Sequence, residues 1–287
     1  MEQQFRPAGA LPPEAQAHYA TAVELHRLSQ GTGQLEFVRS QDILSRYLPS
    51  PPAIIFDVGG GPGHYAYWLA GQGYRVHLID GVPLHIEQAQ QLAANESLPP
   101  LASLSVGDAR QLDVADDSGD TVLLMGPLYH LTARQERLAA LREARRIVKP
   151  EGLVFATGIS RFTSILDGLV SGYLNDPEFV RIVQQDLLDG QHRNPRNHPA
   201  YFTTTFFHAP AELQREMEES GLRHEATLSV EGPAWLLGNF AEHWHNPSRR
   251  KRLLTALRGL EGEPSLLGAS AHLMAIGRKV LGAREPA

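Results

Sequence analysis

The chain contains no cysteine, which excludes disulfides, thiolate zinc sites and cysteine nucleophiles. It also lacks a basic excess, because 26 Lys and Arg stand against 32 Asp and Glu for a net charge of −6. Nucleic-acid surfaces normally need a basic patch, and the one dense basic run, 249–252, is interpreted as the solvated start of a helix. No apolar run approaches the roughly 20 residues of a membrane span, and residues 1–6 are polar, unlike a signal peptide. These absences favour a cytoplasmic protein whose partner is a small molecule, with no nucleic acid and no membrane.

Between residues 53 and 159 the chain instead holds a regular alternation of two kinds of segment. Short apolar runs rich in β-branched residues alternate with amphipathic stretches of helical period. The predicted strands are 53–58, 74–79, 102–106, 120–125 and 153–159. The predicted helices between them are 64–72, 84–95 and 133–148. Such alternation predicts a parallel sheet that is covered by helices on both faces.

The same pattern divides the chain into four segments. Residues 1–50 are predicted to form a helical cap, and residues 51–159 the core. In residues 160–209 the alternation stops and aromatic residues gather, which predicts a helical insertion on the substrate side. Residues 210–287 are expected to complete the core. We therefore predict an α/β fold with three layers, a doubly wound and mostly parallel sheet, a helical N-terminal cap and a helical insertion after the fifth strand.

A glycine-dense turn, Asp57-Val58-Gly59-Gly60-Gly61-Pro62-Gly63, follows the first predicted strand. Glycines permit positive φ angles and let a cofactor approach the backbone closely. A plain turn or a dinucleotide site would also use them, but the spacing differs from the G-x-G-x-x-G of dinucleotide enzymes. Asp57 is expected to face the amino group of a methionine moiety. Asp80, 17 residues beyond Gly63 at the tip of the second strand, is suited to accept hydrogen bonds from ribose hydroxyls.

Four motifs in order resemble those of the class I, Rossmann-like S-adenosylmethionine-dependent methyltransferases: residues 53–63, 76–80, 106–110 and 144–153. The resemblance implies S-adenosylmethionine as cofactor and S-adenosylhomocysteine as product. It also implies a final antiparallel strand, which segments 222–231 and 269–277 can supply. In this family the acid of the third motif typically meets the adenine amino group. The expected cofactor contacts are Asp57, Gly59, Gly60, Gly61, Gly63, Asp80, Gly81, Asp108, Ala109 and Met125.

Methyl transfer is an in-line displacement, so the protein mainly aligns the nucleophile and excludes water. An acceptor that is a hydroxyl or a protonated amine also needs a base. Residues 125–131 follow the fourth strand, where the resemblance implies the boundary between cofactor and substrate. The catalytic candidates there are His130 and Tyr129. His130 is either the base or a structural histidine beneath the loop, and Tyr129 is alternatively packed beside the cofactor.

The expected substrate contacts come from the cap and the insertion: Tyr19, Arg39, His198, Tyr201, Phe206 and His208. Aromatic walls with a few polar groups are typical of small-molecule pockets, although the insertion residues are equally compatible with a lid core and surface histidines. Arg39 is expected to pair with the cofactor carboxylate or to form an ordinary surface pair. No metal is expected, because the histidines lack a metal-ligand pattern.

The function predicted from the sequence is that of an S-adenosylmethionine-dependent methyltransferase with a small-molecule acceptor, O or N favoured over C. Two alternatives stay open: an RNA- or protein-directed methyltransferase, and a non-catalytic S-adenosylmethionine-binding protein. The glycine spacing disfavours a fourth reading, an NAD oxidoreductase.

Overall fold

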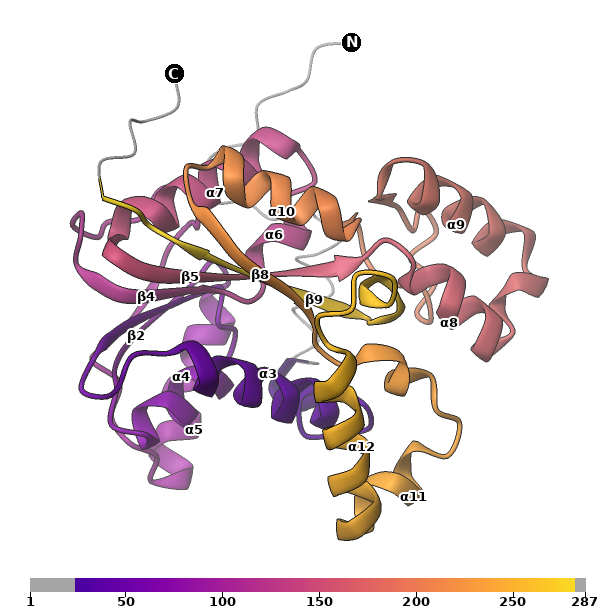
Figure 1. The fold of residues 1–287 in the computed structure, drawn as a ribbon, viewed down its shortest axis with the longest axis horizontal. Coiled ribbons are helices and arrows are strands. Elements are labelled where there is room, and N and C mark those ends of the chain that lie inside the picture. Colours follow the sequence, from indigo (N-terminus) through magenta and orange to yellow (C-terminus); the bar gives the residue numbers. More distant parts are fainter. Residues whose placement is uncertain (1–23, 282–287) are drawn as a thin grey trace.

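The computed structural model describes residues 24–281, and the predicted substrate contact Tyr19 lies outside them. Five parallel strands form the centre of one twisted sheet in the order β3-β2-β1-β4-β5 (Figure 1). The strands are β1 (Ile54–Val58), β2 (Arg75–Asp80), β3 (Ser103–Val106), β4 (Gly119–Leu124) and β5 (Val148–Ser160). All five predicted strands are therefore present, in the order that places the carboxyl ends of β1 and β4 side by side.

The last strand of the chain closes the sheet in the opposite direction. β9 (His272–Arg278) runs antiparallel to β5 on one side and to β8 (Arg223–Ser229) on the other. Its first residue pairs with Ile159 at the carboxyl end of β5. The final antiparallel strand and the doubly wound, mostly parallel sheet are thus confirmed.

Helices cover both faces of the sheet, as predicted (Figure 1). One face carries α3 (Gly33–Tyr47), α4 (His64–Gly71) and α5 (Pro83–Glu96), and the other carries α7 (Arg134–Ile147) and α10 (Pro210–Glu219). Successive residues of a strand point to opposite faces. On β1, Phe56 and Val58 belong to the core with α7 and α10, whereas Ile55 belongs to the core with α3 and α4. Burial on both faces explains why β1 and the second half of β5 are mostly apolar.

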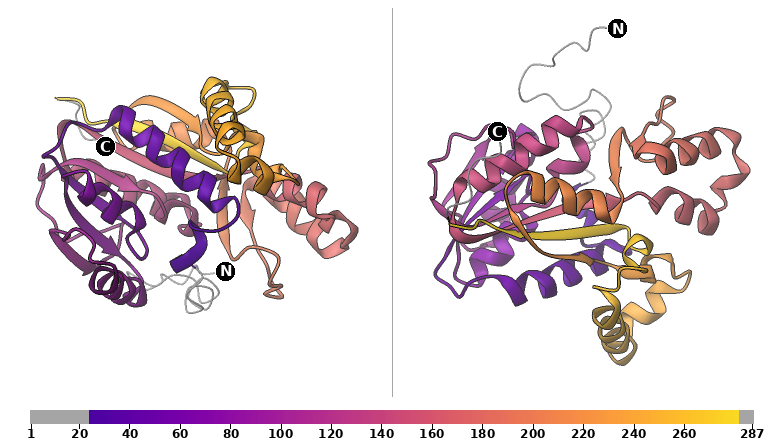
Figure 2. Two further views of the ribbon diagram at one scale, coloured as in Figure 1. Left: turned by 90° about the horizontal axis from the view of Figure 1, so that it is seen from below. Right: turned by 45° about the horizontal axis from the view of Figure 1, so that its top comes forward.

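The insertion projects beyond the sheet from the end of β5 (Figures 1 and 2). It contains α8 (Thr163–Ser171), α9 (Pro177–Asp189) and the short strands β6 (Gln191–His192) and β7 (Thr205–His208). Asp176 caps α9 by accepting from the amide of Glu178. β7 returns to the main sheet and pairs with the last residues of β5. The helical insertion predicted after the fifth strand is confirmed, and it stands over the carboxyl edge of the sheet.

Four further helices complete the described chain: α2 (Glu24–Arg27), α6 (Pro127–His130), α11 (Phe240–His245) and α12 (Pro247–Leu260). The basic run 249–252 lies exposed in the first turns of α12, as predicted. Within residues 24–281 no helix combines the length and the apolarity needed to cross a bilayer.

Candidate active site

The glycine turn between β1 and α4 has the backbone that only glycine adopts readily. Gly59, Gly61 and Gly63 have φ angles of +73°, +58° and +87°. A Cβ on Gly59 would lie 2.5 Å from the ring of Pro127, the first residue of α6. A Cβ on Gly61 would meet no atom within 4 Å, so this residue borders open space. The turn therefore packs against α6 on one side and leaves its backbone open on the other.

That open side faces a cavity at the carboxyl ends of the parallel strands, which we refer to as the glycine-loop pocket. Ligands in open α/β sheets bind at this edge. Eight of the ten expected cofactor contacts line the pocket: Gly59, Gly60, Gly61, Asp80, Gly81, Asp108, Ala109 and Met125. Gly63 instead caps the N-terminus of α4.

Asp80 at the end of β2 is buried and holds the glycine turn in place. Its carboxylate accepts from the amide of Gly61 at 2.8 Å, from the amide of Val82 at 2.8 Å and from the His85 ring at 3.0 Å. The two amides come from the two loops that flank the pocket. Asp80 therefore fixes both loops relative to β2, and its carboxylate lies in the pocket wall, where ribose hydroxyls were expected.

Asp57 lies beneath the turn and not in the pocket wall, away from the expected contact with the methionine amino group. Its side chain is fully buried beneath the turn, where a Cβ on Gly60 would lie 2.5 Å from Oδ2, and it is absent from the pocket wall. Among the described residues no hydrogen bond of standard geometry reaches either carboxylate oxygen. Burial, with the charge of Asp80, raises the pKa of Asp57 to about 7, and the nearby Ala66 amide opposes this only in part.

Asp57 should make the stability of the ligand-free protein depend on pH. A raised folded-state pKa means that between about pH 4 and pH 7 the folded protein keeps a proton that the unfolded chain releases. The contribution of Asp57 to the free energy of unfolding therefore falls as the pH rises through this range. We expect Asp57→Asn to raise the melting temperature at pH 8 and to leave it nearly unchanged at pH 4. Melting curves of the exposed control Asp113→Asn should follow the wild type, and an equal response of both variants would contradict the assignment.

Asp108 and its neighbours form a charged wall of the same pocket. The guanidinium of Arg110 binds the Asp108 carboxylate at 2.7 Å and reaches Glu136 of α7. All three residues line the pocket. Arg110 and Glu136 were not predicted, although Arg110 lies two residues beyond the acid of the third motif.

The two catalytic candidates lie side by side on the buried helix α6. The ring centroids of Tyr129 and His130 are 4.6 Å apart. Burial raises the pKa of the Tyr129 hydroxyl well above its usual range, so the hydroxyl keeps its proton near neutral pH. Both residues line the glycine-loop pocket, but only Tyr129 also lines a second cavity.

That second cavity lies between the insertion and the sheet edge, and we refer to it as the insertion chamber. It shares Glu24, Arg27 and Tyr129 with the glycine-loop pocket, so the two cavities adjoin. Its apolar wall is aromatic and includes Phe179, Tyr201, Phe202 and Phe207. His192, also in the wall, is bound at Nδ1 by Asp186 at 2.9 Å and at Nε2 by the Phe202 carbonyl at 3.2 Å. His192 is thus held rigidly by the insertion's own polar groups.

Comparison with known proteins identifies the domain that carries this geometry. Residues 56–156, from β1 into β5, match the family model described as a methyltransferase domain. Residues 56–156 therefore form a methyltransferase domain, and the chain as a whole resembles the class I S-adenosylmethionine-dependent methyltransferases. The predicted resemblance and the predicted fold are thereby confirmed, and S-adenosylmethionine is the methyl donor that a methyltransferase domain of this family implies.

Individual relatives of this chain are distant. The methyltransferase GfsG of Streptomyces halstedii is 30% identical over 123 residues, 42% of this chain and 40% of that protein. The chain therefore spans less than half of this curated relative. A methyltransferase structure from Methanosarcina mazei has a TM-score of 0.56 at 19% identity, over 83% of this chain and 97% of that one. A putative methyltransferase from Haloferax volcanii, solved with the Trm112 methyltransferase activator, has a TM-score of 0.58 at 16% identity, over 96% of this chain and all of that one.

The residues of the glycine-loop pocket fit the methyl donor that this family uses. The open side of Gly61 leaves its backbone accessible to a ligand, and Asp80 and Asp108 place carboxylates in the pocket wall. Ribose hydroxyls and an adenine amino group are hydrogen-bond donors, which carboxylates accept. The pocket thus presents hydrogen-bond acceptors to the donor groups of the expected ligand.

Three of the expected substrate contacts lie away from the insertion chamber, and each has a physical reason. Side chains alternate along β7, so Phe207 faces the insertion chamber while Phe206 and His208 point the other way. Phe206 packs against the Arg137 guanidinium at 3.5 Å, and His208 binds Glu216 of α10 at 3.2 Å.

Arg39 is the third expected substrate contact that lies elsewhere. It is buried away from both cavities and binds the Val230 carbonyl, Asp42 and Glu261. By contrast, His198 and Tyr201 line the insertion chamber, stacked with ring centroids 4.1 Å apart.

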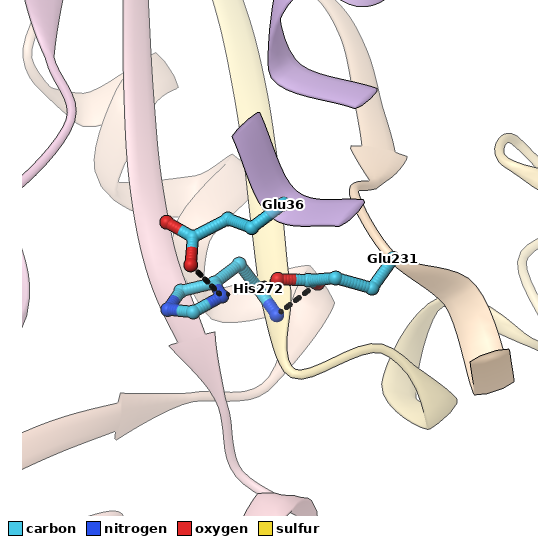
Figure 3. A group of neighbouring side chains, drawn as sticks. All are labelled: Glu36, Glu231 and His272. Carbon is cyan, nitrogen blue, oxygen red and sulfur yellow. Dashed lines mark hydrogen bonds and ion pairs between the residues drawn. The ribbon is translucent and has the colours of Figure 1, made fainter. Parts of the chain in front are cut away.

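A charged cluster at the edge of the insertion chamber was not predicted (Figure 3). Glu36 of α3, Glu231 and His272 of β9 bring one ligand atom each within 4.8 Å of one another, a spacing that a metal ion also requires. Arg27 binds both oxygens of Glu36, and His272 Nδ1 lies 2.6 Å from Glu231. The guanidinium and a proton on the imidazole therefore supply the positive charge that a cation would bring.

Proposed function

We propose that this methyltransferase transfers a methyl group to a small-molecule acceptor, at oxygen or nitrogen rather than carbon, and releases S-adenosylhomocysteine. One observation carries the proposal: the glycine-loop pocket and the insertion chamber adjoin and share Glu24, Arg27 and Tyr129. A donor in the first cavity and an acceptor in the second meet at these three residues. An aromatic chamber beneath a helical insertion suits a small molecule better than a polymer surface.

The roles of the protein residues follow from this arrangement. S-adenosylmethionine, when bound, would supply a methyl group on a sulfonium sulfur. The nucleophile of the acceptor attacks the methyl carbon in line with the C–S bond, and S-adenosylhomocysteine leaves. We assign Asp80 to the ribose end of the donor, and the aromatic walls of the chamber to the exclusion of water. Tyr129 positions the acceptor at the boundary between the cavities. His130, beside Tyr129, is the side chain that we propose removes the acceptor's proton.

Two other functions use the same fold. A methyltransferase that acts on RNA or protein would present an exposed acceptor site, and the Trm112 activator complex belongs to a related structure rather than to this chain. A non-catalytic S-adenosylmethionine-binding protein would need only the glycine-loop pocket. The insertion chamber favours the small-molecule enzyme over both.

Blocking the two cavities separately tests the proposal. Ala109 lines only the glycine-loop pocket, and Thr163 of α8 lines only the insertion chamber. We expect Ala109→Trp to abolish S-adenosylhomocysteine binding in calorimetry, because the indole fills the donor site. Thr163→Trp should bind the nucleoside with an affinity within about twofold of the wild type, because Thr163 begins α8 and lies outside the donor site.

Turnover separates the remaining alternatives. Release of S-adenosylhomocysteine is measured with a panel of small phenols, acids and amines, and in parallel with RNA and protein extracts. Both tryptophan variants should lose turnover of the small-molecule acceptor. Turnover that survives Thr163→Trp, or that occurs only with macromolecules, would contradict the small-molecule proposal, and donor binding without any turnover would favour the binding protein.

A further inference from the structure

His272 occupies a position that matters for any ligand in the insertion chamber. It is the first residue of β9 and pairs with Ile159 at the carboxyl end of β5, the edge where ligands of such sheets bind. Both residues line the chamber. The strand pairing fixes the backbone of His272, and the amide of His272 donates to Glu231 at 2.9 Å. The imidazole is therefore anchored on a rigid element rather than on a loop.

The two ring nitrogens of His272 face different surroundings. Nδ1 binds Glu231 at 2.6 Å and lies 3.8 Å from Glu36. Both carboxylates line a third cavity, and His272 lines both that cavity and the insertion chamber. In Figure 3 the second nitrogen lies on the side of the ring away from Glu231. Because Nδ1 is occupied by the carboxylates, Nε2 is the ring nitrogen that remains for a ligand in the chamber.

The surrounding charges decide the protonation state of the ring. Burial lowers the pKa of His272, but the charges of Glu36 and Glu231 and the hydrogen bond that the imidazole donates to Glu231 outweigh burial and raise it to about 9. Arg27 of α2 is the opposing cation, and its guanidinium is itself bound to Glu24 and Glu36. Near neutral pH both ring nitrogens therefore carry protons, and Nε2 is a hydrogen-bond donor.

The charge balance also limits what Nε2 can bind. Three carboxylates, Glu24, Glu36 and Glu231, surround two cations, Arg27 and His272, so the cluster carries a net charge of −1. The net negative charge of the cluster would repel an anionic ligand in the chamber. A ligand ammonium group cannot accept the hydrogen bond that Nε2 donates. A neutral carbonyl oxygen meets neither obstacle.

We propose that His272 determines acceptor specificity by donating a hydrogen bond from Nε2 to a neutral carbonyl oxygen of an aromatic acceptor. The aromatic part is inferred from the walls of the chamber, where Phe179, Tyr201 and Phe207 pack around the space. This inference rests on the proposed function, because it concerns the acceptor side of the same site. His272 acts here as a positioning residue and takes no part in methyl transfer itself.

Benzamide is the probe for this inference, with benzoate and benzylamine as charged controls of the same ring. Each is titrated by NMR into the full chain saturated with S-adenosylhomocysteine, and again without the nucleoside. We expect benzamide to bind more tightly than either control. His272→Phe keeps a flat ring without a donor and should weaken benzamide at least about tenfold. His272→Gln, which retains a donor, should restore most of the affinity.

A pH series on the wild type tests the same bond without mutation. Benzamide affinity should stay constant below about pH 9 and fall above it. Above this pH the ring loses one proton, and the remaining proton on Nδ1 is held by Glu231, so Nε2 no longer donates. Equal benzamide affinity of the wild type and His272→Phe, failure of His272→Gln to restore binding, or tighter binding of benzoate or benzylamine would each overturn the inference. Loss of S-adenosylhomocysteine binding in the wild type would instead count against the proposed function, and the titrations without nucleoside then judge His272 separately.

Discussion

Replacing Glu216 with alanine is expected to lower the free energy of unfolding by about 3–5 kcal/mol, because the substitution leaves a buried cation without its partner. Arg137 of α7 is 2% exposed and binds Glu216 of α10 through two nitrogens, at 2.7 Å and 2.9 Å. The Glu216 carboxylate also accepts from His208 at the end of β7. One carboxylate thus joins α7, α10 and the strand that returns from the insertion.

The neighbouring glutamate on the same helix is the matched control. Glu219 pairs with Arg134, but both side chains are nearly half exposed, 48% and 45%. Such a surface pair contributes about 0–1 kcal/mol, so Glu219→Ala should change urea unfolding only slightly. If the two alanine variants unfold at the same urea concentration, the buried pair is not the link between these elements.

The same carboxylate predicts sensitivity to acid. Burial alone would raise the pKa of Glu216, but hydrogen bonds from His208 and Arg137 outweigh burial and lower it to about 2. A depressed folded-state pKa gives stability that is complete above the unfolded value of about 4.5 and is lost as the pH falls toward 2. The wild type should therefore lose stability between about pH 5 and pH 2 faster than Glu216→Gln.

The sheet and the glycine-loop pocket could be predicted because their information is local. A strand, a glycine turn and a helix follow one another between Ile54 and Gly71, and the motif spacing fixes their order. The parallel arrangement then brings the strand ends together without further information. Asp57 was misplaced because its side chain alternates to the underside of the turn, and sequence spacing does not report on which side of a turn a strand-end residue lies.

Which side chains face the insertion chamber could not be predicted, because contacts between distant parts of the chain decide it. Arg39 binds Glu261, 222 residues away, and no local pattern pairs these two among the chain's many charges. Phe206 and His208 were expected in the chamber from residue type within a predicted helical insertion, whereas the segment forms β7, whose alternation turns Phe207 to the chamber and its two neighbours to the opposite face. His272 did carry a signal, because it is a polar residue that opens the otherwise apolar run 272–277.

Gly59→Ala is expected to disrupt the glycine-loop pocket and to abolish S-adenosylhomocysteine binding. Gly59 has a φ of +73°, where an L-residue costs about 1–2 kcal/mol. Its new Cβ would also lie 2.5 Å from the Pro127 ring, and relieving such overpacking costs a further 1–3 kcal/mol, roughly. Pro127 begins α6, so the displacement would move Tyr129 and His130 away from the turn. Calorimetry and thermal unfolding of the purified variant measure both effects.

Two other glycines separate the clash from the backbone strain. Gly31 has a φ of +49° and open space around its Cβ position, and it lies in a loop before α3. Gly31→Ala should therefore show only the strain, with normal nucleoside affinity. Gly61 has a φ of +58° and equally open space, but that space is the glycine-loop pocket. Gly61→Ala should match Gly31→Ala in stability and yet bind S-adenosylhomocysteine more weakly, because the methyl group enters the donor site. The prediction would be contradicted if Gly59→Ala were as stable as Gly31→Ala and bound the nucleoside with wild-type affinity. Such a result would mean that α6 can move without loss of stability and that the glycine turn does not position α6.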